Sequence, residues 1–286
     1  MTIREALTEA ANLIAQPDAR RDADMLLAHV LHRERAWLLA HSDEALAEPE
    51  LGALRALAGR RATHEPLQYL TGHQEFYGLD FRVTPDVLIP RPETEHLVEA
   101  VLLWATRFHD ERTLHIADVG TGSGAIAVAL ATHLAGANFV ATDISVAALA
   151  VARENARAHG CKERITFLQC DLLSGAGMAL EAGFRFDAVV SNPPYVPSAD
   201  APTMQPEVVL HEPHTALFAG ESGLDIYRRL IPAAYASLRE DGLLALEIGH
   251  GQRDDIAALL DGWDDVHFVD DYQGIPRVAL ALRPAE

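Results

Sequence analysis

The chain has 286 residues, of which 49% are apolar, so it can form one large domain, or a large and a small one, around real cores. Its formal net charge of -19 argues against nonspecific nucleic-acid binding, because phosphate contacts need clustered Lys and Arg. Residues 1–20 lack a basic start and an apolar stretch, so we expect no signal peptide, no membrane span and a cytoplasmic location. The two cysteines lack metal-ligand spacing and predict neither a disulfide framework nor a metal site.

Residues 2–72 carry a helical pattern. Apolar residues recur at helical spacing, for example Ile3, Leu7, Ala10 and Leu13, and no strand pattern interrupts them. We predict a small bundle of about four or five helices, which forms an N-terminal domain over residues 1–73. Such a domain either caps the main domain or recognises a partner.

Residues 74–91 change character, because aromatic and aliphatic residues alternate there with Gly, Asp and Pro. This pattern predicts a β-hairpin linker. Pro92 then fits the first position of a helix, with Glu93 and Glu95 favourable near its positive end. We expect that helix to run to about residue 109.

Strand and helix patterns alternate over the rest of the domain at 92–286, which predicts an α/β fold with a parallel sheet covered on both faces. Residues 196–222 form one long irregular connection with four prolines, and a loop of that length is usually functional or disordered. The candidate strands are residues 114–118, 137–143, 165–169, 186–191, 242–248, 266–269 and 277–282. The candidate helices are residues 124–134, 146–159, 223–238 and 252–260.

A glycine-rich segment directly follows the first strand of this domain and opens a helix. Glycines let the backbone turn sharply and let a ligand approach main-chain atoms that a Cβ would shield, so a nucleotide-like ligand fits here. The same spacing satisfies the dinucleotide fingerprint with its permitted alanine, and a tight turn without a ligand is the alternative. The segment consists of Asp118, Val119, Gly120, Thr121, Gly122, Ser123 and Gly124.

Two acidic residues end the next two strands. Asp143 can accept hydrogen bonds from both hydroxyls of a ribose, or else cap a helix with Ser145. Asp171 can accept from an exocyclic amine while Leu172 packs against a ring face, or else cap a loop. Asp143 does not distinguish one adenosine-containing ligand from another.

The strand at 186–191 leads into Asn192, Pro193, Pro194 and Tyr195. An amide nitrogen is a poor nucleophile, because its lone pair is delocalised into the carbonyl group. Asn192 Oδ1 and a backbone carbonyl of the Pro193 peptide can accept the two hydrogens of one planar NH2 group, while Tyr195 lies against its face. Attack on an activated methyl group then becomes largely a matter of positioning. The alternative is a simple Pro-Pro turn after a strand.

These segments together resemble Class I S-adenosylmethionine-dependent methyltransferases, and more closely the HemK/PrmC family of protein-(glutamine-N5) methyltransferases that act on peptide release factors. The resemblance covers nearly the whole chain. The NPPY motif is shared with adenine-N6 DNA methyltransferases, whereas segments 65–72 and 89–95 resemble this family specifically. The carriers are residues 65–72 (EPLQYLTG), 89–95 (IPRPETE), the glycine loop 120–124, 192–195 (NPPY), 211–213 (HEP), 223–230 (GLDIYRRL) and 247–249 (EIG).

The resemblance implies a Rossmann-like seven-stranded sheet with an antiparallel last strand, a helical N-terminal domain and a hairpin linker. It implies S-adenosyl-L-methionine as cofactor, with contacts at loop 120–124, Asp143, Asp171, Leu172 and Asn192, and S-adenosyl-L-homocysteine as product. It also implies that residues 192–195 hold the glutamine amide of the Gly-Gly-Gln loop of a release factor. One departure is the extended Gly/Ala-rich loop at 174–185, near the expected adenine contact.

Three other functions compete with this interpretation. A DNA-adenine methyltransferase would use the same motif, but it needs phosphate contacts that the charge of -19 disfavours. An NAD-dependent oxidoreductase fits the glycine loop but gives no role to residues 192–195. A non-catalytic scaffold that binds translation factors does not require an intact Asn192. We therefore expect a protein substrate and no direct contact with nucleic acid or membranes.

Overall fold

The computed structural model describes residues 1–108, 113–175 and 184–285. These residues divide into two compact units, the first made of Met1–His73 and Met204–His211, the second of Gln74–Thr203 and Glu212–Glu286. None of the described helices has the length and the apolarity that crossing a membrane requires.

The first unit is a bundle of helices, as the sequence predicted. Helix α1 begins at a reciprocal cap, in which Glu5 N donates to Thr2 Oγ1 at 3.2 Å and Thr2 N donates to Glu5 Oε2 at 2.8 Å. The apolar faces bury a core that includes Leu7, Leu26 and Leu54. The helices of residues 1–73 are α1 (Ile3–Ile14), α2 (Ala19–Leu31), α3 (Arg35–Ala40), α4 (Glu48–Ala62) and α5 (Leu67–Thr71).

The connection at 196–222 is not irregular, as the sequence had suggested, but holds η4 (Ser198–Thr203), α9 (Pro206–His211) and α10 (His214–Leu217). The physical reason is that proline fits the start of a helix, where its missing N–H costs no intrahelical bond. Pro206 is the first residue of α9, and Pro213 is the N-cap of α10. In the first unit, Glu207 of α9 pairs at 2.9 Å with the buried Arg61.

The second unit begins with a hairpin of β1 (His73–Phe76) and β2 (Leu79–Arg82). Tyr77 and Gly78 form its two-residue turn with φ of 52° and 72°. Strand pairing ends at Arg82. The hairpin is therefore shorter than the predicted linker at 74–91, and residues 83–91 follow it without strand structure. Pro92 opens a 3₁₀ turn, η1 (Pro92–Thr94), before α6 (Glu95–Ala105), and η2 (Thr106–Phe108) follows. The expected helix end at residue 109 lies outside the described residues.

A seven-stranded sheet forms the centre of this unit, with the strand order β5-β4-β3-β6-β7-β9-β8. Pairing is parallel from β5 through β7, and β9 runs antiparallel to both β7 and β8, which confirms the expected sheet. Strand β7 begins four residues earlier than predicted, because Leu238 pairs with Phe186 ahead of a bulge. The strands are β3 (His115–Val119), β4 (Asn138–Asp143), β5 (Ile165–Gln169), β6 (Phe186–Ser191), β7 (Leu238–Glu247), β8 (Asp264–Asp270) and β9 (Pro276–Leu282).

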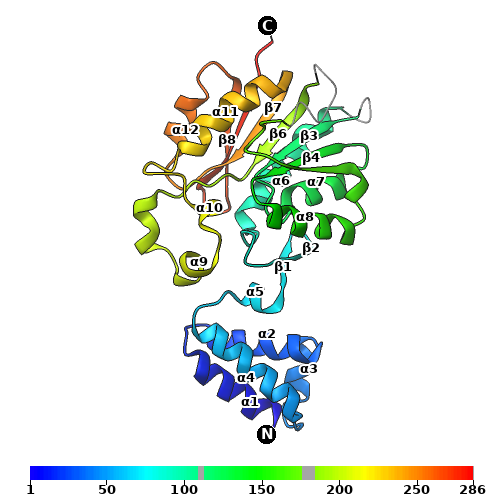
Figure 1. Cartoon of the computed structure of the whole chain (residues 1–286), viewed down its shortest axis with the longest axis vertical. Helices are drawn as coiled ribbons and strands as arrows, with labels where there is room; N and C mark the ends of the chain where they lie inside the picture. Colours follow the sequence, from blue (N-terminus) through cyan, green and yellow to red (C-terminus); the bar gives the residue numbers. More distant parts are fainter. Residues whose placement is uncertain (109–112, 176–183, 286) are drawn as a thin grey trace. The chain divides into compact units, whose positions relative to one another are not determined.

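Helices cover both faces of this sheet (Figure 1), namely α6, α7 (Ala125–His133) and α8 (Val146–Ala158) on one face and α11 (Asp225–Ser237) and α12 (Arg253–Leu259) on the other. A short turn, η3 (Lys162–Arg164), precedes β5. Successive strand side chains point to opposite faces, so Ile116 packs in the core beneath α7 while Ala117 packs with Tyr227 of α11.

Strand β3 lies between β4 and β6, and the order of the strands reverses at this point. Crevices at the carboxyl ends of strands at such a switch point are the usual ligand sites of open parallel sheets. The glycine loop follows directly on β3, β4 ends in Asp143, and Asn192 follows directly on β6.

Asn155 of α8 holds the glycine loop against the hairpin. Its buried amide accepts from Arg82 N at 2.8 Å and donates to Arg82 O at 3.0 Å and Ser123 O at 2.8 Å. Asn155→Ala leaves these backbone groups without partners and is expected to lower the free energy of unfolding by about 2–4 kcal/mol in urea titrations. Arg157→Ala, at an exposed position of the same helix, is the control, with an expected change of about 0.5 kcal/mol or less. Equal effects of both substitutions would contradict this role of Asn155.

Candidate active site

A cavity of about 310 Å³ lies at the carboxyl ends of β3, β4, β5 and β6. Its walls come from the glycine loop, the residues after β4, β5 and β6, the segment at 85–88, and parts of α10 and α11. Seven of the residues predicted from the sequence line it, namely Gly120, Gly122, Asp143, Asp171, Leu172, Asn192 and Pro194. The remaining five, Thr121, Ser123, Gly124, Pro193 and Tyr195, support this wall or lie next to it.

The glycine loop presents an open surface to this cavity. Gly120 and Gly122 have φ of 71° and 54°, and a Cβ built on either would meet no atom within 4 Å. The structure therefore leaves space beside both Cα atoms that a ligand can fill. Gly124 has a different role, because a Cβ there would lie 3.1 Å from the Cβ of Ala152 in α8, so this glycine permits close packing of the helix.

Four of the five backbone amides of residues 120–124 donate hydrogen bonds within the protein. Gly120 N and Thr121 N both donate to Thr142 O at 2.9 Å, and Gly124 N donates to Thr121 O at 2.8 Å. Gly122 N donates to Asp143 Oδ2 at 2.9 Å. A pyrophosphate would need such amides as free donors, so the loop suits a ligand without phosphate.

Asp118 lies near the end of β3 and is the first residue of the glycine-rich segment. The sequence does not predict it as a site residue. Its Oδ2 accepts from the Thr121 hydroxyl at 2.6 Å and from Ala127 N at 3.1 Å, while its Oδ1 has no partner among the described residues. Complete burial raises the pKa of this carboxyl group to about 7, against the effect of these two hydrogen bonds. Thr121 is thereby held below the loop surface.

Asp143 supports the loop and still faces the cavity. Its Oδ1 accepts from Ser145 N at 2.8 Å, in addition to the bond from Gly122 to Oδ2. The helix-capping role belongs to Ser145 instead, whose hydroxyl oxygen accepts from Ala148 N at the start of α8. A carboxylate offers about four acceptor positions, so Asp143 retains capacity for two ligand hydroxyls.

Asp171 and Leu172 follow β5 on the same wall of the cavity. Asp171 forms an ion pair with Arg229 of α11, and both side chains are largely exposed. Leu172 has a φ of 53°, and its carbonyl oxygen accepts from the Thr142 hydroxyl at 2.8 Å. The Arg229 pair is a contact that the sequence pattern did not reveal. Of the Gly/Ala-rich loop that follows, residues 176–183 lie outside the described residues.

Asn192 emerges from β6 at the edge of the cavity. Its Nδ2 donates to Thr94 Oγ1 at 3.0 Å, which leaves Oδ1 as an acceptor for the cavity. Pro193 is buried, and Pro194 lines the cavity beside Asn192. The Tyr195 hydroxyl donates to Glu247 Oε1 at 3.4 Å, and burial beside this carboxyl group raises the pKa of Tyr195, so the phenol stays neutral.

Several cavity residues were not predicted from the sequence. They include residues 85–88, which follow the hairpin, and Thr215 and Ala216 of α10. The apolar residues Val87 and Leu88, directly before segment 89–95, are the sequence feature that could have indicated this part of the cavity wall. The sequence pattern predicts a hairpin linker there instead.

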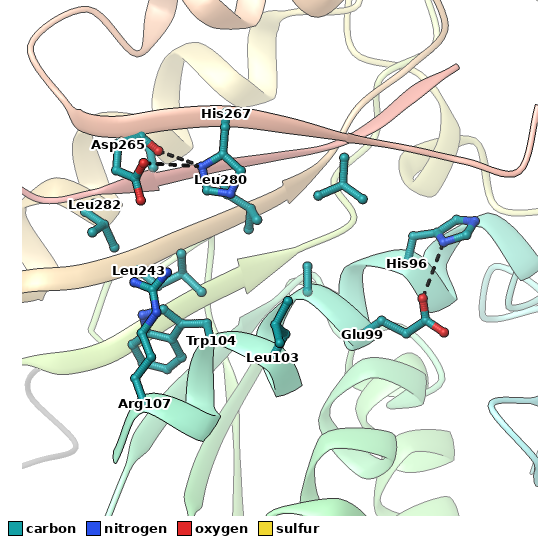
Figure 2. Close-up of a pocket in the computed structure, with 13 residues that line it drawn as sticks. His96, Glu99, Leu103, Trp104, Arg107, Leu243, Asp265, His267, Leu280 and Leu282 are labelled. Atoms are coloured by element: carbon teal, nitrogen blue, oxygen red, sulfur yellow. Dashed lines mark hydrogen bonds and ion pairs between the residues drawn. The ribbon is translucent and has the colours of Figure 1, made fainter. Parts of the chain in front are cut away.

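A second cavity of about 250 Å³ lies between α6 and strands β7, β8 and β9 (Figure 2). Apolar side chains such as Trp104 and Leu280 line it. Two polar pairs also belong to the lining, with His96 Nδ1 3.6 Å from Glu99 Oε2 and His267 Nδ1 3.8 Å from Asp265 Oδ1. None of the predicted site residues faces this cavity. Among the residues that the structure describes, no group of three or more His, Cys, Asp or Glu is arranged to hold a metal ion.

The sequence of this chain matches known protein families and known proteins. Residues 5–72 match the PrmC N-terminal domain, and residues 97–222 match the Methyltransferase small domain. The chain is 47% identical to the release factor glutamine methyltransferase of Moorella thermoacetica, with 100% of both chains covered. It is 42% identical to the protein of the same name from Koribacter versatilis, with 99% of both covered.

Solved structures share the fold at low sequence identity. The catalytic domain of hMettl16, solved with an RNA hairpin, has a TM-score of 0.57 at 17% identity and covers 79% of this chain and 82% of its own. A 16S rRNA methyltransferase of Thermus thermophilus, solved with AdoMet and guanosine, has a TM-score of 0.52 at 21% identity and covers 74% of this chain and 49% of its own. These likenesses show the fold alone.

Proposed function

Since the chain belongs to the family of release factor glutamine methyltransferases, we propose that it methylates N5, the side-chain amide nitrogen, of the glutamine in the Gly-Gly-Gln loop of peptide chain release factors. Methylation of these factors supports translation termination, and we place the enzyme in the cytoplasm, where termination takes place. The observation that carries the proposal is the position of Asn192, whose amide lies on the cavity wall with Oδ1 available as an acceptor.

The cofactor is S-adenosyl-L-methionine, which supplies an activated methyl group on a positively charged sulfur and leaves as S-adenosyl-L-homocysteine. The cavity fits it in three respects. The open surface of Gly120 and Gly122 admits a ligand without phosphate, and Asp143 has free acceptor positions for the two ribose hydroxyls. Asp171 and Leu172 line the same cavity, and we assign them to contacts with the adenine base. The carboxylates of Asp86 and Asp143 on this wall suit a cation, and the engaged loop amides disfavour the pyrophosphate of NAD.

Residues 192–195 hold the substrate amide. Asn192 Oδ1 accepts one hydrogen of the glutamine NH2 group, and a backbone carbonyl of the Pro193 peptide accepts the other. Two acceptors in fixed positions orient the nitrogen towards the methyl donor and draw electron density onto it, so most of the barrier is lowered by positioning. The Tyr195 ring packs beside the substrate amide, and the Tyr195 hydroxyl donates a hydrogen bond to Glu247.

Recognition of the release factor and transfer of the methyl group belong to different parts of the chain. Residues 1–73 recognise the release factor, residues 74–91 link the two parts, and residues 92–286 carry the transfer site. The match of residues 5–72 to a family domain separate from the one at 97–222 supports this division. The net charge of -19 supports a protein substrate without direct contact to nucleic acid. We propose no membrane partner.

The direct test is transfer of labelled methyl groups from S-adenosyl-L-methionine. The purified enzyme is incubated with an intact release factor, with the same factor carrying Ala for the Gln of its Gly-Gly-Gln loop, and with duplex DNA. Label is expected in the intact factor alone, and mass spectrometry should locate it on that glutamine. Label in DNA, or equal label in both factors, would overturn the proposed function.

Asn192→Ala tests the amide clamp. The substitution removes one preorganised acceptor, so the rate of methyl transfer should fall by roughly 10²- to 10³-fold. The dissociation constant of S-adenosyl-L-methionine, measured by calorimetry, should hardly change. A loss of cofactor affinity of the same size would instead assign Asn192 to cofactor binding.

Asp143→Ala should have the opposite effect. Loss of charged hydrogen bonds to the ribose is expected to raise the dissociation constant of the cofactor by roughly 10- to 100-fold, with a smaller change of kcat at saturation. Asp86→Ala removes the same charge from the wall of the same cavity without touching the glycine loop, and it should have less effect. An unchanged dissociation constant in Asp143→Ala would refute the ribose assignment.

A further inference from the structure

Three of the family-like segments meet at one side chain that belongs to none of them. Gln252, the residue before α12, is buried, with an exposed fraction of 8%. Its Nε2 donates to Tyr195 O at 3.1 Å and to Gly223 O at 3.3 Å, and its Oε1 accepts from Gly249 N at 2.9 Å. Gln252 does not line the cavity of the candidate site. Its three partners come from three different segments, namely 192–195, 223–230 and 247–249.

These partners fix which way the Gln252 amide faces. A backbone N–H can only donate a hydrogen bond, and a backbone carbonyl can only accept one. Gly249 N therefore requires the oxygen of the amide, and the carbonyls of Tyr195 and Gly223 require its two hydrogens. An amide that turned over would lose all three bonds. The Gln252 side chain is therefore held in a single orientation.

Gly223 and Gly249 leave the space that this arrangement needs. A Cβ on Gly223 would lie 2.4 Å from Tyr195 O and 2.9 Å from Gln252 Nε2. A Cβ on Gly249 would lie 2.8 Å from Gln252 Oε1 and 3.0 Å from Tyr195 Cδ2. A side chain at either position would displace the Gln252 amide or Tyr195, because a close-packed interior offers no free volume beside them.

Residues 193–195 depend on the bond from Gln252 because of the two prolines. Pro193 and Pro194 have no N–H, so they donate no hydrogen bond that could tie the main chain to its surroundings. Among the described residues, the bond from Gln252 is the one hydrogen bond that reaches a main-chain atom of residues 193–195. Pro194 also restricts the backbone of Pro193 to extended conformations. A shift of the Tyr195 carbonyl therefore carries the Pro193 carbonyl with it.

We propose that Gln252 is a positioning residue that holds the Pro193 carbonyl where it accepts a hydrogen of the substrate amide. This inference rests on the proposed role of residues 192–195 as the substrate clamp. Asn192, the other acceptor, has a separate support, because its Nδ2 donates to Thr94 Oγ1 at 3.0 Å. Both supports are needed, since an NH2 group is oriented only when both of its hydrogens are accepted.

The test compares kcat of full-length variants with an intact release factor at saturating S-adenosyl-L-methionine. Gln252→Met keeps the size of the side chain but removes its three hydrogen bonds, so kcat should fall by roughly 10- to 100-fold as the acceptor moves out of place. Leu260→Ala is the control, because it weakens the same core at the other end of α12, and its kcat should match wild type. In both variants, calorimetry should give the wild-type dissociation constant and stoichiometry for the cofactor, which shows that each is folded.

Gly249→Ala tests the same contact without altering Gln252, and it decides the question if Gln252→Met fails to fold. The added Cβ would displace the Gln252 amide oxygen, so kcat should fall while cofactor affinity is retained. Gly136→Ala is the matched control, because a Cβ there would meet no atom within 4 Å, and its kcat should equal that of wild type. Equal values of kcat in Gly249→Ala and Gly136→Ala would contradict the inference.

A double variant separates positioning from a loss of stability. In Asn192→Ala the substrate NH2 group has already lost one acceptor, so adding Gln252→Met should cost less than it does in wild type. Fully additive losses, wild-type kcat in Gln252→Met, or an equal loss in Leu260→Ala would each overturn the inference. Failure of the wild-type enzyme to methylate the release factor would overturn the proposed function itself. Active wild type with insensitive variants would overturn the positioning role alone.

Discussion

Parallel pairing of β3 with both β4 and β6 brings three strand ends to the same edge of the sheet, where the strand order reverses. The turn after β3 contains the glycine loop, β4 ends in Asp143, and β6 leads into Asn192. Each strand is buried on both faces, so none of these ends can move without disturbing the core. The candidate cofactor wall and the candidate substrate clamp therefore have fixed positions relative to each other, as a transfer reaction requires.

Around this edge, buried polar side chains form hydrogen bonds that hold the segments of the candidate site in place. Asp118 holds Thr121 beneath the glycine loop, and Asn155 bonds the loop to the hairpin. Behind the NPPY segment, Gln252 donates to Tyr195 O at 3.1 Å, while Gly249 and Gly223 leave no room for a side chain beside Tyr195. Such supports keep the reacting groups in place without contacting ligands themselves.

A second group of contacts explains why separate family-like segments belong together. Arg91 of segment 89–95 forms an ion pair with the buried Glu212 of segment 211–213, and Ile89 N donates to Glu212 Oε2 at 3.3 Å. Thr94 of the first segment reaches Asn192, and Glu247 reaches Tyr195. A buried charge is costly without a partner, so each segment constrains the others. We interpret the segments as parts of a single frame around residues 192–195.

Local patterns in the sequence determined the helical N-terminal part, the order of strands and helices, and the residues that end β3, β4, β5 and β6, because periodicity and strand-end chemistry involve neighbouring residues. The family-like motifs identified the NPPY segment and the glycine loop. Only the tertiary structure decided which distant groups meet: Thr94 and Asn192 lie 98 residues apart, and Tyr195 and Glu247 lie 52 apart. It also decided that Asp171 pairs with Arg229 and that residues 85–88 line the cavity. These contacts depend on how the sheet brings separate segments together, and no local pattern encodes that.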